Sequence, residues 1–484
     1  MNPKKISVFV FLVLAALLAL TLVSQSINQP GGKTEEGFSL GFSILKYPKL
    51  SSFMQSSDKV EHKKEIDSIV QNIQTAVVEE IPEKPETPNF SVIDTSKIVR
   101  IDYPENKVAF LETLRSQFTS GNCRIVHYGD SQLEGDRISA YVRNRLQGLY
   151  GGTGPGFIPV EQVYEHISAI VTPSANWLRY AAFDPTQRRL EHRKYGIYTS
   201  LSRFTPHRYE KDSLVPPNLE VQKATIRIEP SSRLYGRLAK YTRVGLHYGE
   251  CLSPTRINVY QDGALIKSDS LITDGRYHQY LMRFSTTPNE IVIELEGKVS
   301  PDFYGITLDG DGGVSLDNVA MRGASGTIFV SQNSQVFSQM SSVLNPDIFI
   351  FQYGGNTVPY LKDKKGVENY TRYMLSNINW VRRHNPKATI LFIGPADMST
   401  SMNGAMVTYP LLPYLNEKLR EMCLKNNIAY WSMYEAMGGE NSMPYWVDQK
   451  LASTDYTHFS SGGTRIISEL FFTALQLDLK DNLN

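Results

Sequence analysis

Short apolar runs alternate with helical patterns over two stretches of the chain, residues 97–160 and 313–484. The runs that fit buried strands are Arg124–Tyr128, Val314–Met321, Ile348–Phe351, Thr389–Ile393 and Ile428–Met433. Between them apolar residues recur at helical spacing, for example at Ile138, Tyr141 and Val142. Five apolar strands alternating with helices predict an α/β fold in which a parallel sheet lies between two layers of helices. In such sheets a ligand binds outside the carboxyl ends of the strands.

The stretch between these two halves, residues 161–312, has a different pattern. Polar and apolar residues alternate with a period of two at Ala224–Ile228, Val244–Tyr248, Arg256–Tyr260 and Glu290–Leu295. Asp262-Gly263 and Asp274-Gly275 supply tight turns. We therefore expect an antiparallel β-sandwich that is inserted into the α/β domain.

The N-terminus predicts export. Lys4 and Lys5 precede residues 6–23, which are apolar with two exceptions. This run has the minimum length of a spanning helix and is longer than most signal-peptide cores. Residues 1–24 are therefore expected to form an uncleaved membrane helix, with a cleaved signal segment as the alternative. In both cases the body reaches the cell envelope, anchored to the inner membrane and facing the periplasm or secreted to the periplasm.

Residues 25–96 are predicted to be a stalk or linker. Pro82–Pro88 is rich in proline and charge, as stiff linkers are. Ahead of it, Ile66, Val70 and Ile73 recur at helical spacing between charged residues. They predict a solvated helix, or else a helix that packs on the body or on a second chain.

Composition excludes some classes of function. The 484 residues require two or three domains. A formal charge of +1, with no basic run that contains interleaved aromatic residues, argues against nucleic-acid binding. Cys123, Cys251 and Cys423 are far apart and lack metal-ligand spacing, so we expect them to be buried apolar residues. Neither a metal nor a cofactor is predicted.

Candidate chemistry begins at Ser131. Gly129 ends the first strand and a helical pattern follows Ser131, so the hydroxyl lies where free backbone N–H groups gather at a helix start. This position suits a nucleophile that must later hold an oxyanion. The simpler interpretation is that Ser131 only caps the helix.

Four other residues complete a possible site. Asp455 and His458 lie three residues apart just before the last helix, where the carboxylate can orient the imidazole that takes the proton of Ser131. Gly323 and Asn356 each follow a predicted strand end. The backbone N–H groups of Gly323 and Ser131 and the side-chain amide of Asn356 are expected to converge on a developing oxyanion.

In this order, Gly129-Asp130-Ser131, Gly323, Gly354-x-Asn356 and Asp455-x-x-His458 resemble the four sequence blocks of the SGNH (GDSL) hydrolase superfamily. The resemblance implies a flavodoxin-like α/β/α domain with five parallel strands. It assigns Ser131 as the nucleophile, His458 as the base and Asp455 as the residue that orients it. It assigns Gly323, Asn356 and Ser131 to the oxyanion hole, with Gly326 or a glycine of residues 151–156 as the alternative to Gly323. Thr357 stands where the third block usually has Asp.

The inserted β-domain narrows the resemblance. An insert at this point is similar to that of exported peptidoglycan O-acetylesterases and related O-acetyltransferases, whose insert resembles a carbohydrate-binding module. We therefore expect an extracytoplasmic serine esterase that removes O-acetyl or similar small acyl groups from a polysaccharide such as peptidoglycan. The alternatives are a polysaccharide O-acetyltransferase with the same triad, a lipase-like esterase, and a non-catalytic glycan-binding protein. The insert's aromatic residues are expected to stack on sugar rings unless they fill the sandwich core; among them are Tyr195, Tyr198, Phe204, Tyr248 and Tyr260.

Overall fold

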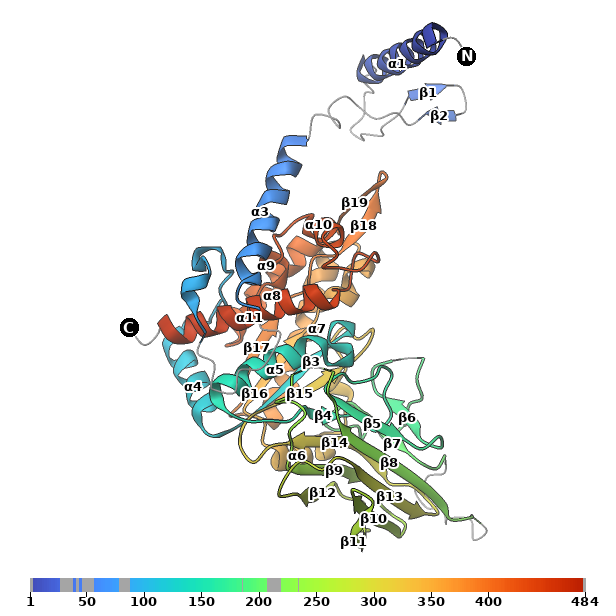
Figure 1. Cartoon of the computed structure of the whole chain (residues 1–484), viewed down its shortest axis with the longest axis vertical. Coiled ribbons are helices and arrows are strands. Elements are labelled where there is room, and N and C mark those ends of the chain that lie inside the picture. Colours follow the sequence, from blue (N-terminus) through green and yellow to red (C-terminus); the bar gives the residue numbers. More distant parts are fainter. Residues whose placement is uncertain are drawn as a thin grey trace. The chain divides into compact units, whose positions relative to one another are not determined.

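The protein was examined as a computed structural model that describes residues 3–26, 38–40, 43–45, 56–77, 88–184, 186–206, 219–233 and 235–481. The chain divides into two compact units, residues 1–68 and 69–484. Elements that begin in the first unit are α1 (Pro3–Ser26), β1 (Phe38–Leu40), β2 (Ser43–Leu45) and α3 (Ser56–Gln74) (Figure 1). The predicted stalk helix is thus present as α3, whereas residues 82–87 of the proline-rich linker lie outside the described residues.

The membrane helix predicted within residues 1–24 is not confirmed. Among the described residues, none of the helices combines the length and apolarity that crossing a bilayer requires.

A five-stranded parallel sheet forms the centre of the second unit. Its spatial order is β15 (Gly313–Ala320), β3 (Asn122–Gly129), β16 (Ile348–Gln352), β17 (Thr389–Ile393) and β20 (Ala429–Trp431). All four pairings are parallel, which confirms the predicted α/β fold. Counted along the chain, the strand order is 2-1-3-4-5, as in flavodoxin-like sheets.

Two groups of helices cover this sheet. One group comprises α4 (Lys107–Thr119), α5 (Arg137–Tyr150) and α11 (Ser461–Asp481), and the other α6 (Ser334–Leu344), α7 (Lys364–His384) and α8 (Leu412–Lys425). His127 Nδ1 of β3 lies 3.1 Å from Ser139 Oγ of α5, whereas its neighbour Tyr128 packs in a cluster with Met374 of α7 and Leu415 of α8. Successive side chains of a strand point to opposite faces, so α5 and the α7–α8 pair lie on opposite faces of the sheet.

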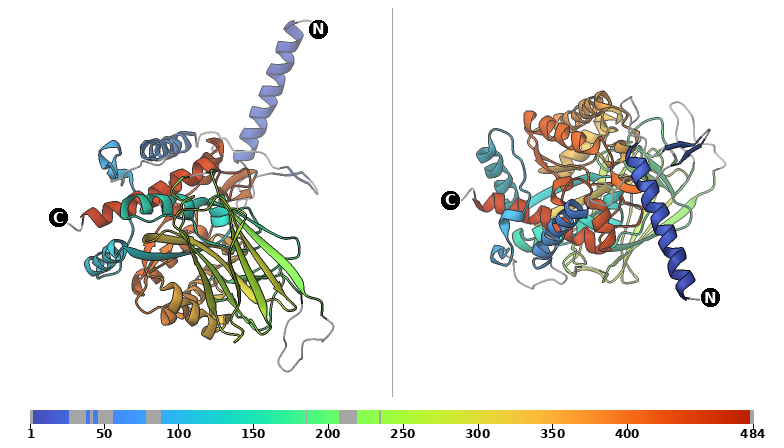
Figure 2. Two further views of the ribbon diagram at one scale, coloured as in Figure 1. Left: turned by 60° about the horizontal axis from the view of Figure 1, so that its bottom comes forward. Right: turned by 90° about the horizontal axis from the view of Figure 1, so that it is seen from above.

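Residues 156–309 build two antiparallel sheets. One sheet contains β5 (Ala169–Pro173), β8 (Gln222–Pro230), β13 (Ile291–Gly297), β10 (Thr255–Gln261) and β11 (Ala264–Ser270). The other contains β6 (Leu178–Ala181), β7 (Ser200–Arg203), β14 (Asp302–Asp309), β9 (Arg243–Gly249) and β12 (His278–Arg283), with β4 (Gly156–Ile158) also paired to β14. These strands run together as one group in Figure 2. Inward residues of both sheets, such as Ile226, Ile293, Leu246 and Phe303, share one apolar cluster.

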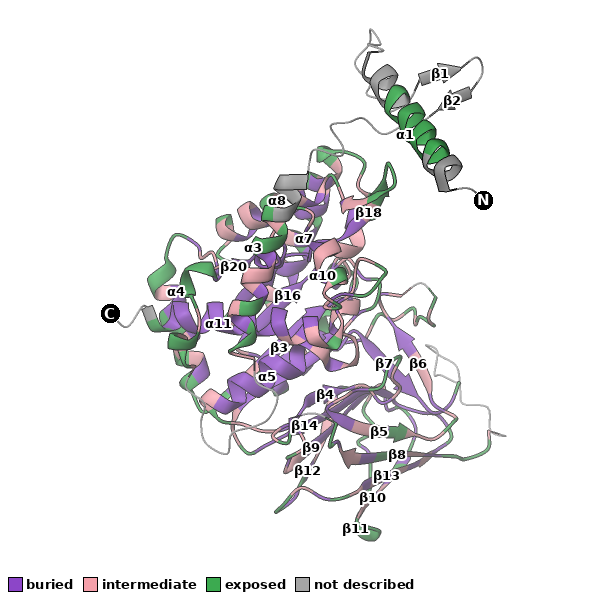
Figure 3. Ribbon diagram, turned by 45° about the horizontal axis from the view of Figure 1, so that its top comes forward, coloured by how far each residue is buried: buried purple, intermediate pink, exposed green. Residues whose placement is uncertain are grey.

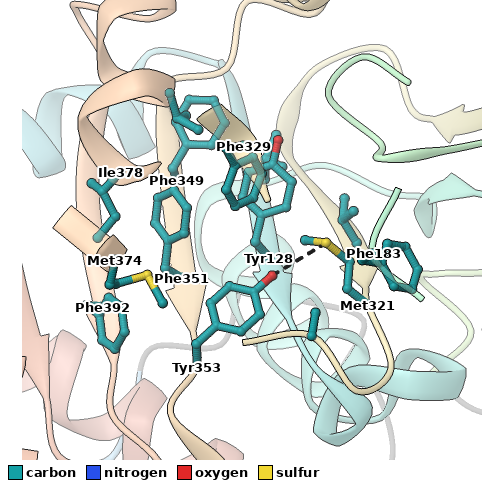
Figure 4. Close-up of a cluster of buried hydrophobic side chains, with 14 of the residues drawn as sticks. Tyr128, Phe183, Met321, Phe329, Phe349, Phe351, Tyr353, Met374, Ile378 and Phe392 are labelled. Atoms are coloured by element: carbon teal, nitrogen blue, oxygen red, sulfur yellow. Dashed lines mark hydrogen bonds between the residues drawn. The ribbon is translucent and has the colours of Figure 1, made fainter. Parts of the chain in front are cut away.

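The inserted sheets and the parallel sheet are packed as one body. Figure 4 shows Phe183 of the insert beside Met321, at the edge of an aromatic cluster that includes Tyr128. The Tyr128 hydroxyl donates to Ile197 O at 2.9 Å. Arg124 of β3 pairs with Asp309 at the end of β14 at 2.5 Å. Buried residues accordingly continue from β3 and β16 into β14 and β7 (Figure 3). The insert can therefore hold side chains in fixed positions near the carboxyl end of β3.

The expectation that the insert's aromatic residues stack on sugars is wrong for four of the five. Tyr195, Tyr198, Phe204 and Tyr248 are at most 2% exposed, because their rings fill the apolar cores. Only Tyr260 is half-buried, and its hydroxyl donates to Glu294 Oε2 at 3.0 Å. All three cysteines are buried and unpaired, as predicted.

Candidate active site

Ser131 lies on a short turn between β3 and α5. The turn η3 (Ser131–Asp136) begins with a cap in which Gln132 N donates to Asp130 Oδ1 at 3.0 Å. Glu134 and Gly135 leave helical geometry, with φ +65° at Gly135, and the regular helix α5 starts only at Arg137. The turn η3 therefore separates Ser131 from the start of the long helix, where the sequence had placed it. The dipole of α5 does not act on Ser131 directly.

Ser131, His458 and Asp455 form one chain of hydrogen-bonding atoms. The Ser131 Oγ lies 2.7 Å from His458 Nε2, and His458 Nδ1 lies 2.7 Å from Asp455 Oδ2. The turn before α11 makes this possible, because Thr457 N and His458 N both donate to Asp455 Oδ1, at 2.9 and 3.0 Å. Gln132 ties this turn to the serine turn by donating to Thr457 O at 2.7 Å.

The electrostatics of Asp455 suit an orienting carboxylate. Partial burial alone would raise its pKa, but the hydrogen bonds from His458 N and from the ring, and from Thr457 N, outweigh burial and lower it. Asp455 therefore stays ionised in mildly acidic solution. An ionised carboxylate at Nδ1 fixes the imidazole tautomer that leaves Nε2 as a proton acceptor facing Ser131.

Gly323 and Asn356 line the same cleft as Ser131 and His458. Gly323 has φ +73° and a Cβ at this position would meet nothing within 4 Å, so the glycine serves a left-handed turn and leaves the space in front of it open. Within the described part of the chain, the N–H groups of Gly323 and Ser131 donate to no other residue. Both are therefore available to a ligand oxygen.

The amide of Asn356 is already engaged. Its Nδ2 donates to Asp130 Oδ2 at 3.2 Å and to Ala324 O at 3.1 Å. Donation to a substrate oxyanion would replace or share one of these bonds. Asp130 is 7% exposed, and burial raises its pKa to about 6, despite the hydrogen bond from Gln132 N. The one sequence signal that could have indicated the contact between Asp130 and Asn356 is the position of Asp130 between Gly129 and Ser131.

Two cavities meet at the serine. The smaller has an empty volume of about 430 Å³ and is lined, besides Ser131 and His458, by Tyr353, Gly394, Pro395, Ala396, Met398 and Met433, among others. The larger has an empty volume of about 1390 Å³ and contains Ser131, Gly323, Asn356 and His458. Four of its other lining residues, Tyr164, Glu165, Ile167 and Arg233, come from the insert, and Arg137 and Arg322 come from the α/β domain. A bound ester would thus have a narrow space on one side of Ser131 and a wide one on the other.

Sequence reasoning missed the arginines of this cleft. Arg137 Nη2 donates to Ser131 O, and its Nε donates to Glu134 O at 3.1 Å. Arg322 pairs with Glu134 at 3.6 Å and lies 5.0 Å from the ring centre of Tyr164. Arg137 and Arg322 each stand within six residues of a motif position, whereas nothing in the sequence places Arg233 near Ser131.

The alternative glycines do not line the cleft, nor do two conspicuous residues close to the motifs in the sequence, His127 and Trp446. A Cβ on Gly326 would lie 2.6 Å from Tyr353 and Met374 side-chain atoms, and one on Gly152 would lie 2.5 Å from Val314 O, so these glycines serve close packing. His127 is 1% exposed, and burial lowers its pKa to about 3, as befits a core residue. Trp446 is fully buried and donates from its indole to Met437 O at 2.9 Å. Of the glycines considered for the second block, Gly323 alone lines the cleft with Ser131.

Comparisons with known proteins agree with this architecture. Neither a family model nor a curated protein matches the chain. A solved structure described as a peptidoglycan O-acetylesterase in action is similar over 78% of this chain and 99% of its own, with a TM-score of 0.58 and 19% identity. This chain therefore shares the fold of that solved structure.

Two more solved structures match at much lower TM-scores. A family two carbohydrate esterase from Clostridium thermocellum covers 55% of this chain and 97% of its own, with a TM-score of 0.24 and 11% identity. A GDSL-like lipase from Bacteroides ovatus covers 64% of this chain and 98% of its own, with a TM-score of 0.24 and 12% identity. Similarity at this level adds no argument about the site.

Proposed function

We propose that the protein is a serine esterase that removes acetyl or similarly small acyl groups from a cell-envelope polysaccharide. The observation that carries the proposal is the chain of two 2.7 Å contacts that links Ser131, His458 and Asp455 at the junction of the two cavities. A hydroxyl, an imidazole and a carboxylate in this order are the parts of an acyl-transfer triad.

The geometry supports a two-step reaction. Ser131 Oγ attacks the ester carbonyl as His458 Nε2 takes its proton, and Asp455 stabilises the imidazolium that forms. Gly323 N–H, Ser131 N–H and the Asn356 amide donate to the oxyanion, each such donor contributing about 3 kcal/mol to the transition state. His458 then gives the proton to the departing sugar oxygen, which leaves as a hydroxyl group while the acyl group stays on Ser131. Water, activated by the same imidazole, releases the acyl group as a carboxylic acid and restores Ser131.

The two cavities support a small acyl group on a large alcohol. Methionine, proline and alanine side chains close the smaller cavity, which suits an acetyl methyl group. The larger cleft is open and lined by Tyr164 and by several charged side chains, which suits a polyhydroxylated chain. A polysaccharide of the cell envelope lies outside the cytoplasm, so we propose that the enzyme acts there.

Acetate release provides the test. The purified body is incubated with O-acetylated peptidoglycan fragments, with and without an added sugar acceptor, and the products are followed by mass spectrometry. We expect free acetate at the same yield in both reactions, and none with Ser131→Ala. Acetyl transfer to the acceptor would instead identify an O-acetyltransferase. Absence of both products from a folded protein would contradict the proposal.

A further inference from the structure

A third cavity adjoins the cleft at the boundary between the insert and the α/β domain. It has an empty volume of about 580 Å³ and shares Glu134, Gly135, Tyr164 and Arg322 with the cleft that contains Ser131. We call it the seam pocket; its further lining includes Phe157, His166, Arg179, Phe183, Tyr198 and Asn318. A ligand bound at Ser131 can therefore extend into it.

The seam pocket contains a half-buried cation, Arg179, that forms no ion pair with any described residue. Arg179 Nε donates to Gln187 Oε1 at 3.0 Å and Nη1 donates to Glu161 O at 3.1 Å, both neutral acceptors. In the described part of the chain no carboxylate oxygen lies within 4.0 Å of its guanidinium, and Glu134 pairs with Arg322 instead. Desolvation lowers the pKa of Arg179 to about 10, although the carboxylates of Glu161, Asp184 and Glu134 attract the cation from farther away. A charge that has lost part of its hydration and has no ionic partner is costly, so a bound anion would offset that cost.

Other side chains of the pocket also lack partners. His166 is 7% exposed, and neither ring nitrogen forms a hydrogen bond within the described residues; Nε2 lies 3.6 Å from Asp136 Oδ2. Asn318 donates from Nδ2 to Leu133 O at 2.8 Å, but its Oδ1 has no described partner. Unsatisfied polar groups at a cavity indicate that water or a ligand completes them.

Part of the pocket wall is aromatic. Phe157 stacks on Tyr198 with ring centres 3.6 Å apart, and Phe183 joins the apolar cluster shown in Figure 4. Aromatic side chains, hydrogen-bonding groups and a cation without an ionic partner suit an acidic sugar, because its ring presents C–H surface, hydroxyls and a carboxylate.

We propose that the seam pocket binds an acidic sugar of the glycan, next to the acetylated residue, with the sugar carboxylate on the Arg179 guanidinium. This inference rests on the proposed function, since it names the substrate class of the same site. It also assigns the insert a role in specificity through the residues of its inner edge.

Matched substrates test the inference without any variant. One is an O-acetylated oligosaccharide containing N-acetylmuramic acid with a free lactyl carboxylate, and the other carries that carboxylate as a methyl amide. We expect wild-type kcat/KM to be at least about tenfold higher for the free acid, as loss of a charge-assisted hydrogen bond commonly costs that factor or more. Equal values for the two substrates would overturn the inference while leaving the esterase intact.

Variants locate the preference. Arg179→Gln removes the charge and should abolish the preference for the acid, whereas Arg179→Lys keeps the charge without the two-pronged geometry and should retain part of it. Arg189→Gln changes the net charge by the same amount at an exposed position ten residues further along the chain and should leave the preference unchanged. A preference that persists in folded Arg179→Gln would place the carboxylate elsewhere.

A binding measurement separates this inference from the proposed function. In calorimetry with the Ser131→Ala variant, N-acetylmuramic acid should bind at least about tenfold more tightly than N-acetylglucosamine, and Arg179→Gln should remove the difference. If neither oligosaccharide releases acetate, the proposed function fails. The calorimetric comparison then still decides whether the seam pocket recognises the acid, and equal affinities would exclude it.

Discussion

The parallel sheet and the inserted sheets use their side chains in opposite ways. In the parallel sheet the chemistry-bearing residues follow the strand ends, so Ser131, Gly323 and Asn356 meet at one edge although they are far apart in the chain. In the insert the side chains that the pattern made prominent, such as Phe204 and Tyr248, point inward and are core. The insert reaches the site through Tyr164 and Arg233, which lie in connections between strands, and through Arg179 on the short strand β6; the polar–apolar pattern of the sequence indicated none of the three. Alternation in an antiparallel sheet separates inside from outside, whereas strand ends in a parallel sheet indicate where function lies.

The largest effect should follow a change at the parallel-sheet edge. Ser131→Ala is expected to lower kcat for a chromogenic acetyl ester by about four orders of magnitude or more, because no nucleophile remains. The melting temperature should stay within a few degrees of wild type, since His458 is the only polar partner of the Ser131 Oγ among the described residues. Initial-rate assays measure kcat, and differential scanning calorimetry measures the melting temperature. Near-wild-type turnover would exclude a serine mechanism.

Substitution of either of the other two triad residues should lower activity by a similar or smaller factor than Ser131→Ala. His458→Ala should cost about as much as Ser131→Ala, and Asp455→Ala somewhat less, because an orienting carboxylate acts only through the imidazole. The double variant Ser131→Ala with His458→Ala should be no slower than either single one. If it proves much slower, the two residues do not act as one unit.

In the insert, the comparison predicts a loss of stability in place of a loss of binding. Phe204 packs edge-on against Trp177, with ring centres 5.7 Å apart, and is 2% exposed. Phe204→Ala should lower the free energy of unfolding by about 3–5 kcal/mol. Tyr260→Ala, at a half-buried position of β10, is the matched control and should cost far less. Urea unfolding checks both; a Phe204 variant with unchanged stability but lost glycan affinity would reverse this view of the insert.

The smallest effect concerns Asp130. Burial raises its folded pKa to about 6, above an unfolded value of about 4. A carboxyl with a raised folded pKa stabilises the fold fully below its unfolded pKa, and this contribution is lost as pH rises through the folded value. Between pH 4 and 6 the wild type should therefore lose stability, on the order of 3 kcal/mol, relative to Asp130→Asn, which does not titrate. If the free energy of unfolding changes with pH in the same way in both proteins, the pKa of Asp130 is not raised in the folded state.

The parallel sheet and the residues at its edge could be predicted from the sequence because each signal that indicates them is local. The run 124–128, the glycine at 129 and the spacing of Asp455 and His458 all act within a few residues. Sequence reasoning placed the start of α5 too early, because the left-handed turn at Gly135 and Asp136 has no strong local signature. It did not find the seam pocket, since Arg179 and Asn318 come together only through the packing of two domains. The engagement of Asn356 by Asp130 likewise depends on three-dimensional contact.

The most direct measurement is the identity of the acylated residue. The protein is mixed rapidly with an activated acetyl ester, quenched in acid, digested and analysed by mass spectrometry. The account predicts a transient acetyl group on Ser131, absent in Ser131→Ala and prolonged in variants that slow deacylation. Turnover without acetylation of Ser131, or acetylation of a different side chain on the same timescale, would contradict the central claim that this serine carries the reaction.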